Sequence, residues 1–418
     1  MLEEILSREN MTKAFKRVKS NKGAAGVDGM TVDELHPYLN ASWPFIKAEI
    51  LEGTYRPSPV KKVEIPKADG SKRTLGIPTV LDRLLQQAIS QKLTEYYDEG
   101  FSESSYGFRP KRSAHQAVRR AQEYLNGGNK IVIELDLEKF FDKVNHDRLM
   151  MILSKRIHDK RLLKVIRKYL TAGIMEEGVI KERTEGTPQG SPLSPILSNI
   201  ILDELDKELE KRGHKFVRYA DDCSIYVRSM KSAERVKESI TRFIEGKMKL
   251  KVNREKSRIS TSKESNLLGF SFYRDGEGYQ IRISNKAYKN FKTRIRKLTS
   301  KRWSISIEER LKMLNKYNRG WVNYFRLAKC RTHLVKLDGW IRFRLRMCIW
   351  KSWKTIKNRI TQLVKLGMDS FHALLNGNTR KKYCRVAHSG ILTVTLTNKF
   401  FTDLGYADLE GIYLKGLI

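Results

Sequence analysis

Two adjacent aspartates, Asp221 and Asp222, interrupt a stretch of Phe, Val, Tyr and Ile residues at positions 216–227. Because both flanks are rich in β-prone residues, the pattern predicts a hairpin with the aspartates at its tip. A partly buried pair of neighbouring carboxylates repels itself unless a cation neutralises it. Carboxylate oxygens suit Mg²⁺, so the pair is a candidate metal site. The ordinary alternative is a solvated turn, in which Asp is a favoured residue.

A third carboxylate, Asp136, follows the apolar stretch 131–135 and precedes Phe140 and Phe141. This stretch also predicts a strand, so two strands would each deliver an aspartate at an end. Two metal ions held in this way can carry out in-line phosphoryl transfer. The third aspartate therefore favours metal-dependent chemistry on a phosphate-bearing substrate.

The charge of the chain points to a polyanionic partner. The 418 residues carry a net charge of +35, and nucleic acid is the commonest partner of such a protein. Residues 281–365 hold 25 Lys or Arg against 3 acidic residues, a net of +22. This segment should dominate salt-dependent phosphate binding. A basic protein without catalytic function is the alternative.

Other classes of protein are disfavoured. The four cysteines form no CxxC pair and have no His at ligand spacing, so we expect neither a zinc site nor a disulfide framework. No apolar stretch is long enough to cross a membrane, and the first residues are too acidic for a signal peptide. We expect a soluble, cytoplasmic protein associated with nucleic acid and not with a membrane.

Sequence patterns predict the elements that would hold the aspartates. Helical spacing is found in the first 55 residues, with a glycine-rich interruption at 21–29, and again at 81–97, 113–125, 146–170, 195–209 and 233–249. A hairpin is expected at 63–78. With a loop of Asp69, Gly70 and Ser71, Lys67 and Arg73 would face each other and could grip a triphosphate. A two-residue turn would place them on opposite faces.

The order of strand, helix, hairpin and helix predicts an α+β fold with an antiparallel sheet backed by helices, the palm type of polymerase core. In the basic segment, residues 311–325 place their apolar side chains on one helical face. Residues 341–353 alternate like a strand, but their position between helical patterns favours a helix.

Taken in order, these motifs resemble those of a group II intron reverse transcriptase and maturase. The motifs that carry the resemblance lie at 22–29, 106–110, 136–141, 188–190, 219–222, 268–270 and 320–325. The chain is most similar to the short subclass that lacks a nuclease domain (group IIC-like). It departs from the usual pattern at Ser191, where relatives commonly have glycine.

The resemblance implies a right-hand polymerase with a helical thumb. It implies fingers with an amino-terminal extension at 1–85, a palm at 86–285, a basic thumb or maturase domain at 286–365 and a short DNA-binding-like region at 366–418. The net charge of the last region is only +2, so strong DNA binding is not expected there.

The resemblance also implies roles for individual residues. Asp136, Asp221 and Asp222, with the carbonyl of Leu137, would hold two Mg²⁺ ions, for which Mn²⁺ is a substitute. Lys256 would protonate pyrophosphate, and Phe141 would exclude a ribose 2′-OH. The nucleotide-binding residues would be Lys67, Arg73, Phe140, Phe141 and Gln189. The primer grip would be Leu268, Gly269 and Phe270. Template or RNA contacts would come from Gly23, Ala24, Ala25, Gly26, Arg109, Arg319, Arg342, Arg344 and Arg346.

The function implied is an RNA-directed DNA polymerase that copies intron RNA into cDNA and also assists intron splicing and mobility. Its partners would be group II intron RNA, an RNA template with a DNA primer, deoxynucleoside triphosphates and target DNA. Two alternatives remain: an RNA-binding splicing cofactor without chemistry of its own, and a related reverse transcriptase that serves DNA repair, a retron or a defence system.

Overall fold

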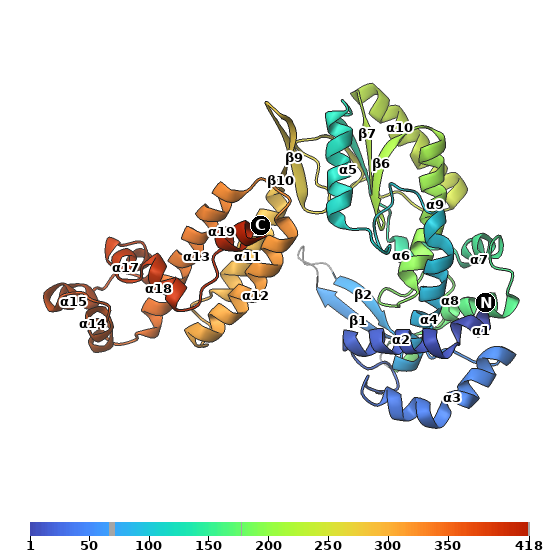
Figure 1. Cartoon of the computed structure of the whole chain (residues 1–418), viewed down its shortest axis with the longest axis horizontal. Helices are drawn as coiled ribbons and strands as arrows, with labels where there is room; N and C mark the ends of the chain where they lie inside the picture. Colours follow the sequence, from blue (N-terminus) through green and yellow to red (C-terminus); the bar gives the residue numbers. More distant parts are fainter. Residues whose placement is uncertain (67–71, 177, 417–418) are drawn as a thin grey trace. The chain divides into compact units, whose positions relative to one another are not determined.

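The computed structural model describes residues 1–66, 72–176 and 178–416. The chain forms two compact units, Met1–Ser262 and Lys263–Ile418 (Figure 1). This division falls within the stretch expected to be palm, and the other expected domain boundaries remain predictions.

The first unit begins with helices, as the sequence indicates. They are α1 (Leu2–Ile5), α2 (Arg8–Asn21), α3 (Leu35–Glu52) and α4 (Val80–Tyr97). The side chain of Ser7 caps α2 by accepting a hydrogen bond from the Asn10 amide. The Asn10 side chain then donates to the carbonyl of Ala88, which fastens α2 to α4. Helix α4 is buried along most of its length and packs against α1 and α2.

A four-stranded sheet in this unit has the order β2-β1-β4-β5. Its strands are β1 (Val60–Pro66), β2 (Lys72–Ile77), β4 (Ile174–Glu176) and β5 (Val179–Lys181). β1 and β2 form the expected antiparallel hairpin, in which Arg73 lies opposite Ile65. This register is not the one that a loop of Asp69, Gly70 and Ser71 would give, and the sequence leaves that loop length open. Lys67 itself lies outside the described residues.

The second sheet of this unit has the order β6-β7-β3-β8, and all its neighbours are antiparallel. Its strands are β3 (Ile131–Leu135), β6 (Lys215–Tyr219), β7 (Asp222–Val227) and β8 (Arg258–Thr261). Ile133 and Ile225 point into the main hydrophobic core. On the opposite face, the ring of Tyr226 lies 5.7 Å from that of Tyr124. The sheet is therefore covered on both faces, which explains why β7 is buried after its first residue.

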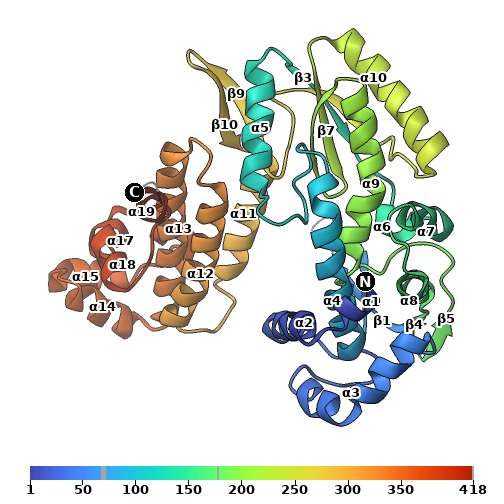
Figure 2. The same ribbon diagram turned by 45° about the vertical axis from the view of Figure 1, so that its right-hand side comes forward.

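Three helices provide this cover. Tyr124 belongs to α5 (Ala114–Asn126), which lies on one side of the sheet, while α9 (Ser194–Lys211) and α10 (Met230–Phe243) lie on the other (Figure 1, Figure 2). The remaining helical elements of the unit are η1 (Asp98–Gly100), α6 (Phe140–Lys143), α7 (His146–Ser154), α8 (Lys160–Thr171) and η2 (Ile244–Met248). The helix expected over 146–170 is broken, because Asp159 caps a new helix at α8.

The second unit starts with the antiparallel pair β9 (Phe270–Asp275) and β10 (Gly278–Ile283). The basic segment then forms α11 (Asn285–Leu298), α12 (Ile307–Phe325) and α13 (Arg331–Ser352). The apolar face expected for α12 is buried, and Trp321 packs with its ring 4.2 Å from that of Phe291. Residues 341–352 lie within α13, so the helical interpretation is confirmed.

Short helices complete the second unit. They are α14 (Ile356–Lys365), α15 (Ser370–Gly377), α16 (Tyr383–Ala387), α17 (Gly390–Thr395), α18 (Asn398–Asp403) and α19 (Leu409–Lys415). The buried carboxylate of Asp338 accepts hydrogen bonds from the Leu409 and Glu410 amides and from the Tyr406 hydroxyl. These bonds fasten α19 to α13.

The expected mixed α+β organisation, with antiparallel strands backed by helices and a helical basic region, is thus confirmed. Across the described part of the chain, no helix combines the length and apolar character needed to span a membrane.

Candidate active site

The two adjacent aspartates lie at a tight hairpin turn. Tyr219 of β6 pairs with Asp222 of β7, which leaves Ala220 and Asp221 as the two turn residues. Ala220 has a φ of 56°, a left-handed conformation that residues with a Cβ rarely adopt. Because this conformation carries strain, surrounding contacts must hold the turn in place.

Asp136 lies beside this turn because of the strand register. Leu135 of β3 pairs with Cys223 of β7, so Asp136 continues the strand at the position next to Asp222. Burial raises the pKa of Asp221, and the negative charge of Asp136 raises it further. The two carboxylates therefore interact, as expected when two strands each deliver an aspartate to one sheet edge.

The side chain of Arg218 is hydrogen-bonded to the turn. Its side chain is fully buried and forms an ion pair with the equally buried Asp206 at 2.6 Å. The guanidinium also donates to the carbonyl of Ala220 at 2.9 Å, to Oδ1 of Asn199 at 3.0 Å and to Oγ of Ser105 at 2.7 Å. Burial alone would lower the pKa of Arg218, but the pair with Asp206 outweighs it and the pKa is raised.

The 106–110 motif packs against the same turn. A Cβ added to Gly107 would lie 2.2 Å from the Ala220 nitrogen, so only glycine fits this approach. The Tyr106 amide donates to the Arg218 carbonyl, and the Asn199 side chain donates to the Gly107 carbonyl. The motif therefore has a structural explanation: it closes the space behind the strained turn.

The segment that carries Lys256 runs alongside Asp136. The Asn253 amide donates to the Asp136 carbonyl at 2.8 Å, and the Asp136 amide donates to Oγ of Ser257 at 3.0 Å. Leu137 forms an isolated antiparallel bridge with Val252. Lys256 is exposed in this segment, so the fold brings its chain position near the aspartates.

Three of the expected nucleotide-binding residues, Arg73, Gln189 and Phe141, belong to segments that are hydrogen-bonded to one another. Nε of Arg73 donates to Oε1 of Gln189 at 2.7 Å, and the Gly76 amide donates to the Gln189 carbonyl at 2.8 Å. The amide of Thr187, in the same loop, donates to the carbonyl of Phe141 at 2.6 Å. These hydrogen bonds thus join strand β2 and the start of α6 to the 187–190 loop, which contains Gln189.

Phe140, also expected to bind nucleotide, is more deeply buried than Phe141. It is 2% exposed and belongs to the hydrophobic core, whereas Phe141 is only partly buried. The sequence predicts two aromatic residues after Asp136 but cannot indicate which one faces inward. The Phe140 side chain therefore has a structural role in the core, and nucleotide binding by it stays a prediction.

Ser191, where the resemblance leads us to expect glycine, is accommodated in the loop. Its hydroxyl is buried and donates to Oε1 of Gln86 at 2.6 Å, and it also accepts from the Leu193 amide. The preceding Gly190 has a φ of 113°, which explains the need for glycine at that position.

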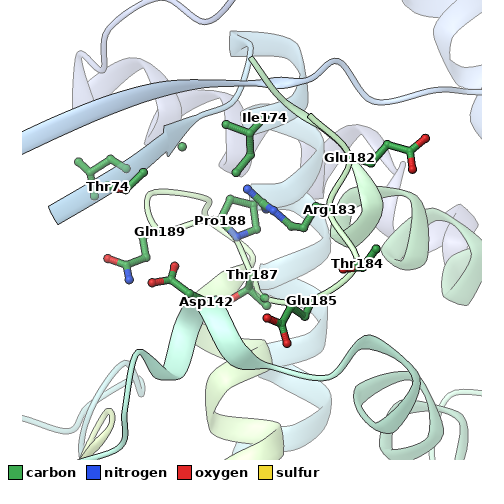
Figure 3. Close-up of a pocket in the computed structure, with 13 residues that line it drawn as sticks. Thr74, Asp142, Ile174, Glu182, Arg183, Thr184, Glu185, Thr187, Pro188 and Gln189 are labelled. Carbon is green, nitrogen blue, oxygen red and sulfur yellow. The ribbon is translucent and has the colours of Figure 1, made fainter. Parts of the chain in front are cut away.

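A cavity of about 230 Å³ lies against the Gln189 loop (Figure 3). Gln189, Asp142 and Arg183 line it, together with residues of β2 and β4. Burial lowers the pKa of Arg183 and raises that of Asp142, and the charges of the two residues oppose these shifts. The cavity therefore contains a partly buried pair of opposite charges next to a nucleotide-binding candidate.

The glycine loop at 23–26 packs on the start of α4. A Cβ on Gly23 would meet the guanidinium of Arg83 at 2.2 Å, and one on Gly26 would meet Cα of Thr79 at 2.6 Å. Arg83 also donates to the Ala24 carbonyl at 2.7 Å. Close packing thus explains these glycines, and contact with a template remains a prediction.

Arg109 is expected to contact RNA, but the structure gives it another role. It is 9% exposed, forms an ion pair with Asp98 at 2.7 Å and donates to the carbonyls of Asp98, Ser102 and Ser105. Its guanidinium is bonded to the protein itself, and an RNA contact by this residue stays a prediction.

The expected primer grip, in the second unit, is a strained turn. Leu267 and Phe270 exchange backbone hydrogen bonds, and the residues between them, Leu268 and Gly269, have φ values of 53° and 84°. The Tyr324 hydroxyl of α12 donates to the Leu268 carbonyl at 2.9 Å. A Cβ on Gly269 would lie 3.1 Å from the ring of Phe325.

The arginines expected to bind RNA in the basic segment differ in exposure. Arg319 is exposed, and Arg342 and Arg344 are partly buried. Arg346 is 8% exposed and donates to the Leu396 carbonyl, and an RNA contact by this residue stays a prediction.

The site is also expected to bind divalent metal. Within residues 1–66, 72–176 and 178–416, no three His, Cys, Asp or Glu side chains lie close enough together to hold a metal ion. The donor chemistry nevertheless fits, because Asp136 and Asp221 present hard oxygen ligands whose mutual repulsion a divalent cation would offset.

Comparison with known proteins identifies the family. Residues 65–272 match the family described as reverse transcriptase (RNA-dependent DNA polymerase), and residues 288–367 match the group II intron maturase-specific domain. The chain is 33% identical over 299 residues to protein YkfC of Escherichia coli (strain K12), which is 62% of this chain and 78% of that protein. The chain belongs to the group II intron reverse transcriptases. The expected family and enzyme class are confirmed.

Other relatives of this reverse transcriptase are encoded by introns. It is 30% identical over 323 residues to the group II intron-encoded protein LtrA of Lactococcus lactis, covering 62% of this chain and 54% of LtrA. It is 29% identical over 387 residues to the putative COX1/OXI3 intron 2 protein of Saccharomyces cerevisiae, covering 76% of this chain and 44% of that protein. The chain thus spans about half the length of these two relatives.

A partial complex of Cas6-RT-Cas1 with Cas2 is among the similar solved structures, with a TM-score of 0.38, 26% identity and coverage of 59% of this chain and 42% of that chain.

The sequence patterns missed the residues that support the turn of this reverse transcriptase. Arg218 is a single cation between apolar strand residues, and Asp206 is an acid next to Leu205 on the buried side of α9. A lone charge in a stretch expected to be buried is the signal that could have found the pair.

Proposed function

We propose that this chain is an RNA-directed DNA polymerase that extends a DNA primer on an RNA template by nucleotidyl transfer assisted by two Mg²⁺ ions. The single observation behind this proposal is the meeting of Asp136 and the Asp221 turn at one edge of the second sheet. Arg73 and Gln189, which are hydrogen-bonded to each other, are proposed to hold the incoming deoxynucleoside triphosphate.

The residues of the chain would act by positioning and by charge. Asp136, Asp221 and Asp222 would hold the metal, which when bound lowers the pKa of the primer 3′-OH and neutralises phosphate charge. Arg73 would place the triphosphate, and Phe141 would exclude a ribose 2′-OH. Lys256 would give a proton to the leaving pyrophosphate. The strained Ala220 turn, held by Arg218, would keep Asp221 in position.

The test is to replace Asp221 with Asn and measure primer extension on an RNA template in the presence of Mg²⁺. We expect extension to be abolished, while RNA affinity stays near that of the unmodified protein, because the change removes a metal ligand and not a phosphate contact. Replacement of the exposed Asp33 with Asn is the matched control. Extension by the Asp221 variant at the rate of the control would refute the assignment.

A maturase role is proposed alongside polymerisation, because residues 288–367 match the maturase-specific domain and lie in the most basic part of the chain. The proposed partners are a group II intron RNA and the target DNA into which the intron moves. Splicing of the parent intron should be faster with the protein than without it. Equal splicing rates would leave polymerisation as the function.

A further inference from the structure

A second nucleic-acid site is indicated in the helical unit, around the exposed indole of Trp303. This residue lies between α11 and α12, and its side chain is 44% exposed. A large aromatic side chain is normally buried, so its exposure requires an explanation. Neither the proposed active site nor the primer grip uses this residue.

Trp303 contributes to the walls of two cavities. One has a volume of about 700 Å³, and Leu298 and Met313 are among its apolar lining residues. The other has a volume of about 270 Å³, and Ile305 and Ile349 are among its apolar lining residues. The exposed Trp303 therefore lines two hollows whose linings include apolar residues.

Both cavities are bordered by cations. Arg294, Arg296, Lys297 and Arg302 line the larger one, and Lys301, Lys351 and Lys354 line the smaller one. Among the described residues that line either cavity, none is Asp or Glu. The cavity beside Gln189, in contrast, is lined by Asp142, Glu182 and Glu185. The surroundings of Trp303 therefore favour a ligand that combines a flat ring with negative charge.

The backbone that carries Trp303 is held in place. The guanidinium of Arg310 is 3% exposed and donates to the carbonyls of Leu298 and Trp303. The Trp303 amide in turn donates to the Ser300 carbonyl at 3.2 Å. A backbone that is held in place lowers the conformational entropy lost when a ligand stacks on the side chain that it carries, which favours binding.

We propose that Trp303 is a stacking platform for unpaired nucleobases of an RNA strand, whose phosphates contact the surrounding cations. Unpaired bases are required because the faces of paired bases are already stacked within a helix, whereas those of single strands can stack on aromatic side chains. The ligand class rests on the proposed function, since it takes RNA to be the partner. The stacking site uses none of the residues proposed for nucleotidyl transfer.

The test is a binding measurement on the full chain with a short single-stranded RNA that contains a fluorescent adenine analogue. Replacement of Trp303 with Ala should weaken binding about 5- to 150-fold, the range for loss of stacking on one base. Trp303→Phe should retain most of the affinity and should also quench the analogue. Phe371 is the matched control, because it is 72% exposed in the same unit and lines neither cavity, so Phe371→Ala should bind normally.

Two further measurements make the test decisive. Arg294→Gln with Arg302→Gln should lower the slope of log affinity against log salt by about 0.7 for each phosphate that the variant no longer neutralises. Duplex RNA should bind Trp303→Ala and the unmodified protein alike. The proposal is overturned if Trp303→Ala binds single strands as tightly as Phe371→Ala does, or if duplex binding falls by the same factor. These measurements involve no nucleotide addition, so their outcome is independent of the Asp221→Asn result.

Discussion

The buried pair of Arg218 and Asp206 offers the sharpest test of how the Asp221 turn is held in place. Replacing Arg218 with Met removes the ion pair together with the bonds to Ala220, Asn199 and Ser105. Both side chains are completely buried, so solvent screening does not weaken the effect. Loss of one partner from such a pair costs about 3–5 kcal/mol of folding free energy, because the other charge is left buried and alone.

A double variant separates stability from positioning. Arg218→Met combined with Asp206→Leu removes both charges and fills the space with apolar groups. Such replacements are often neutral or stabilising, so we expect the double variant to recover most of the lost free energy of unfolding in urea. Its primer extension should stay impaired, because the bond from Arg218 to the Ala220 carbonyl is lost.

The assay therefore has two readouts on the same proteins: urea denaturation and the Mg²⁺ dependence of primer extension. We expect the double variant to be stable but to need more Mg²⁺ or to extend slowly. The reasoning is refuted if this variant extends primers like the unmodified protein at every Mg²⁺ concentration, since Arg218 would then only stabilise the fold.

Three other substitutions probe separate parts of the structure. The pKa of Asp203 is raised by burial to about 6, so its ionised form destabilises the folded state, and stability contributed by its neutral form is lost as pH rises from about 4 to 6. Asp203→Asn should increase the free energy of unfolding at pH 7 by at most about 3 kcal/mol and should have little effect near pH 3; equal gains at both pH values would contradict this. Gly107→Ala should lower the free energy of unfolding in urea by about 1–3 kcal/mol and impair primer extension, because its Cβ would clash with Ala220. The control is Gly276→Ala, where a Cβ meets no atom within 4 Å, and it should leave both measurements unchanged. Tyr324→Phe should weaken binding of primed template by less than about tenfold, because it removes one hydrogen bond to the Leu268 carbonyl. The control is Tyr38→Phe, at a tyrosine with the same 38% exposure, which should leave the affinity for primed template unchanged in a binding titration.

The spacing of apolar residues along short stretches of sequence was sufficient to predict most of the fold and the strands that meet at the candidate site. The apolar flanks of Asp221 and the apolar stretch before Asp136 predicted strands, and the observed register places their ends together. Helical spacing likewise predicted α12 and its buried face. These features depend on residues close in sequence, which is why they can be read from it.

The features that the sequence did not reveal depend on distant contacts. Arg109 and Arg346 look like RNA-binding cations, but each is buried because it donates to backbone carbonyls elsewhere in the fold. The pairing of Arg73 with Ile65 depends on a loop length that composition does not fix. Which of Phe140 and Phe141 enters the core depends on the left-handed Lys139 before them, where α6 begins.

The bond between Tyr324 and the Leu268 carbonyl has a consequence for the evolution and engineering of these enzymes. It joins a residue of the maturase-specific match to a residue of the reverse transcriptase match, although the two matches are separate in sequence. A chimera that exchanges segments between residues 272 and 288 would pair an α12 from one parent with a 268–270 turn from another. Recombination after Ser262 keeps these co-adapted partners together, so functional hybrids should be recovered more often at that junction.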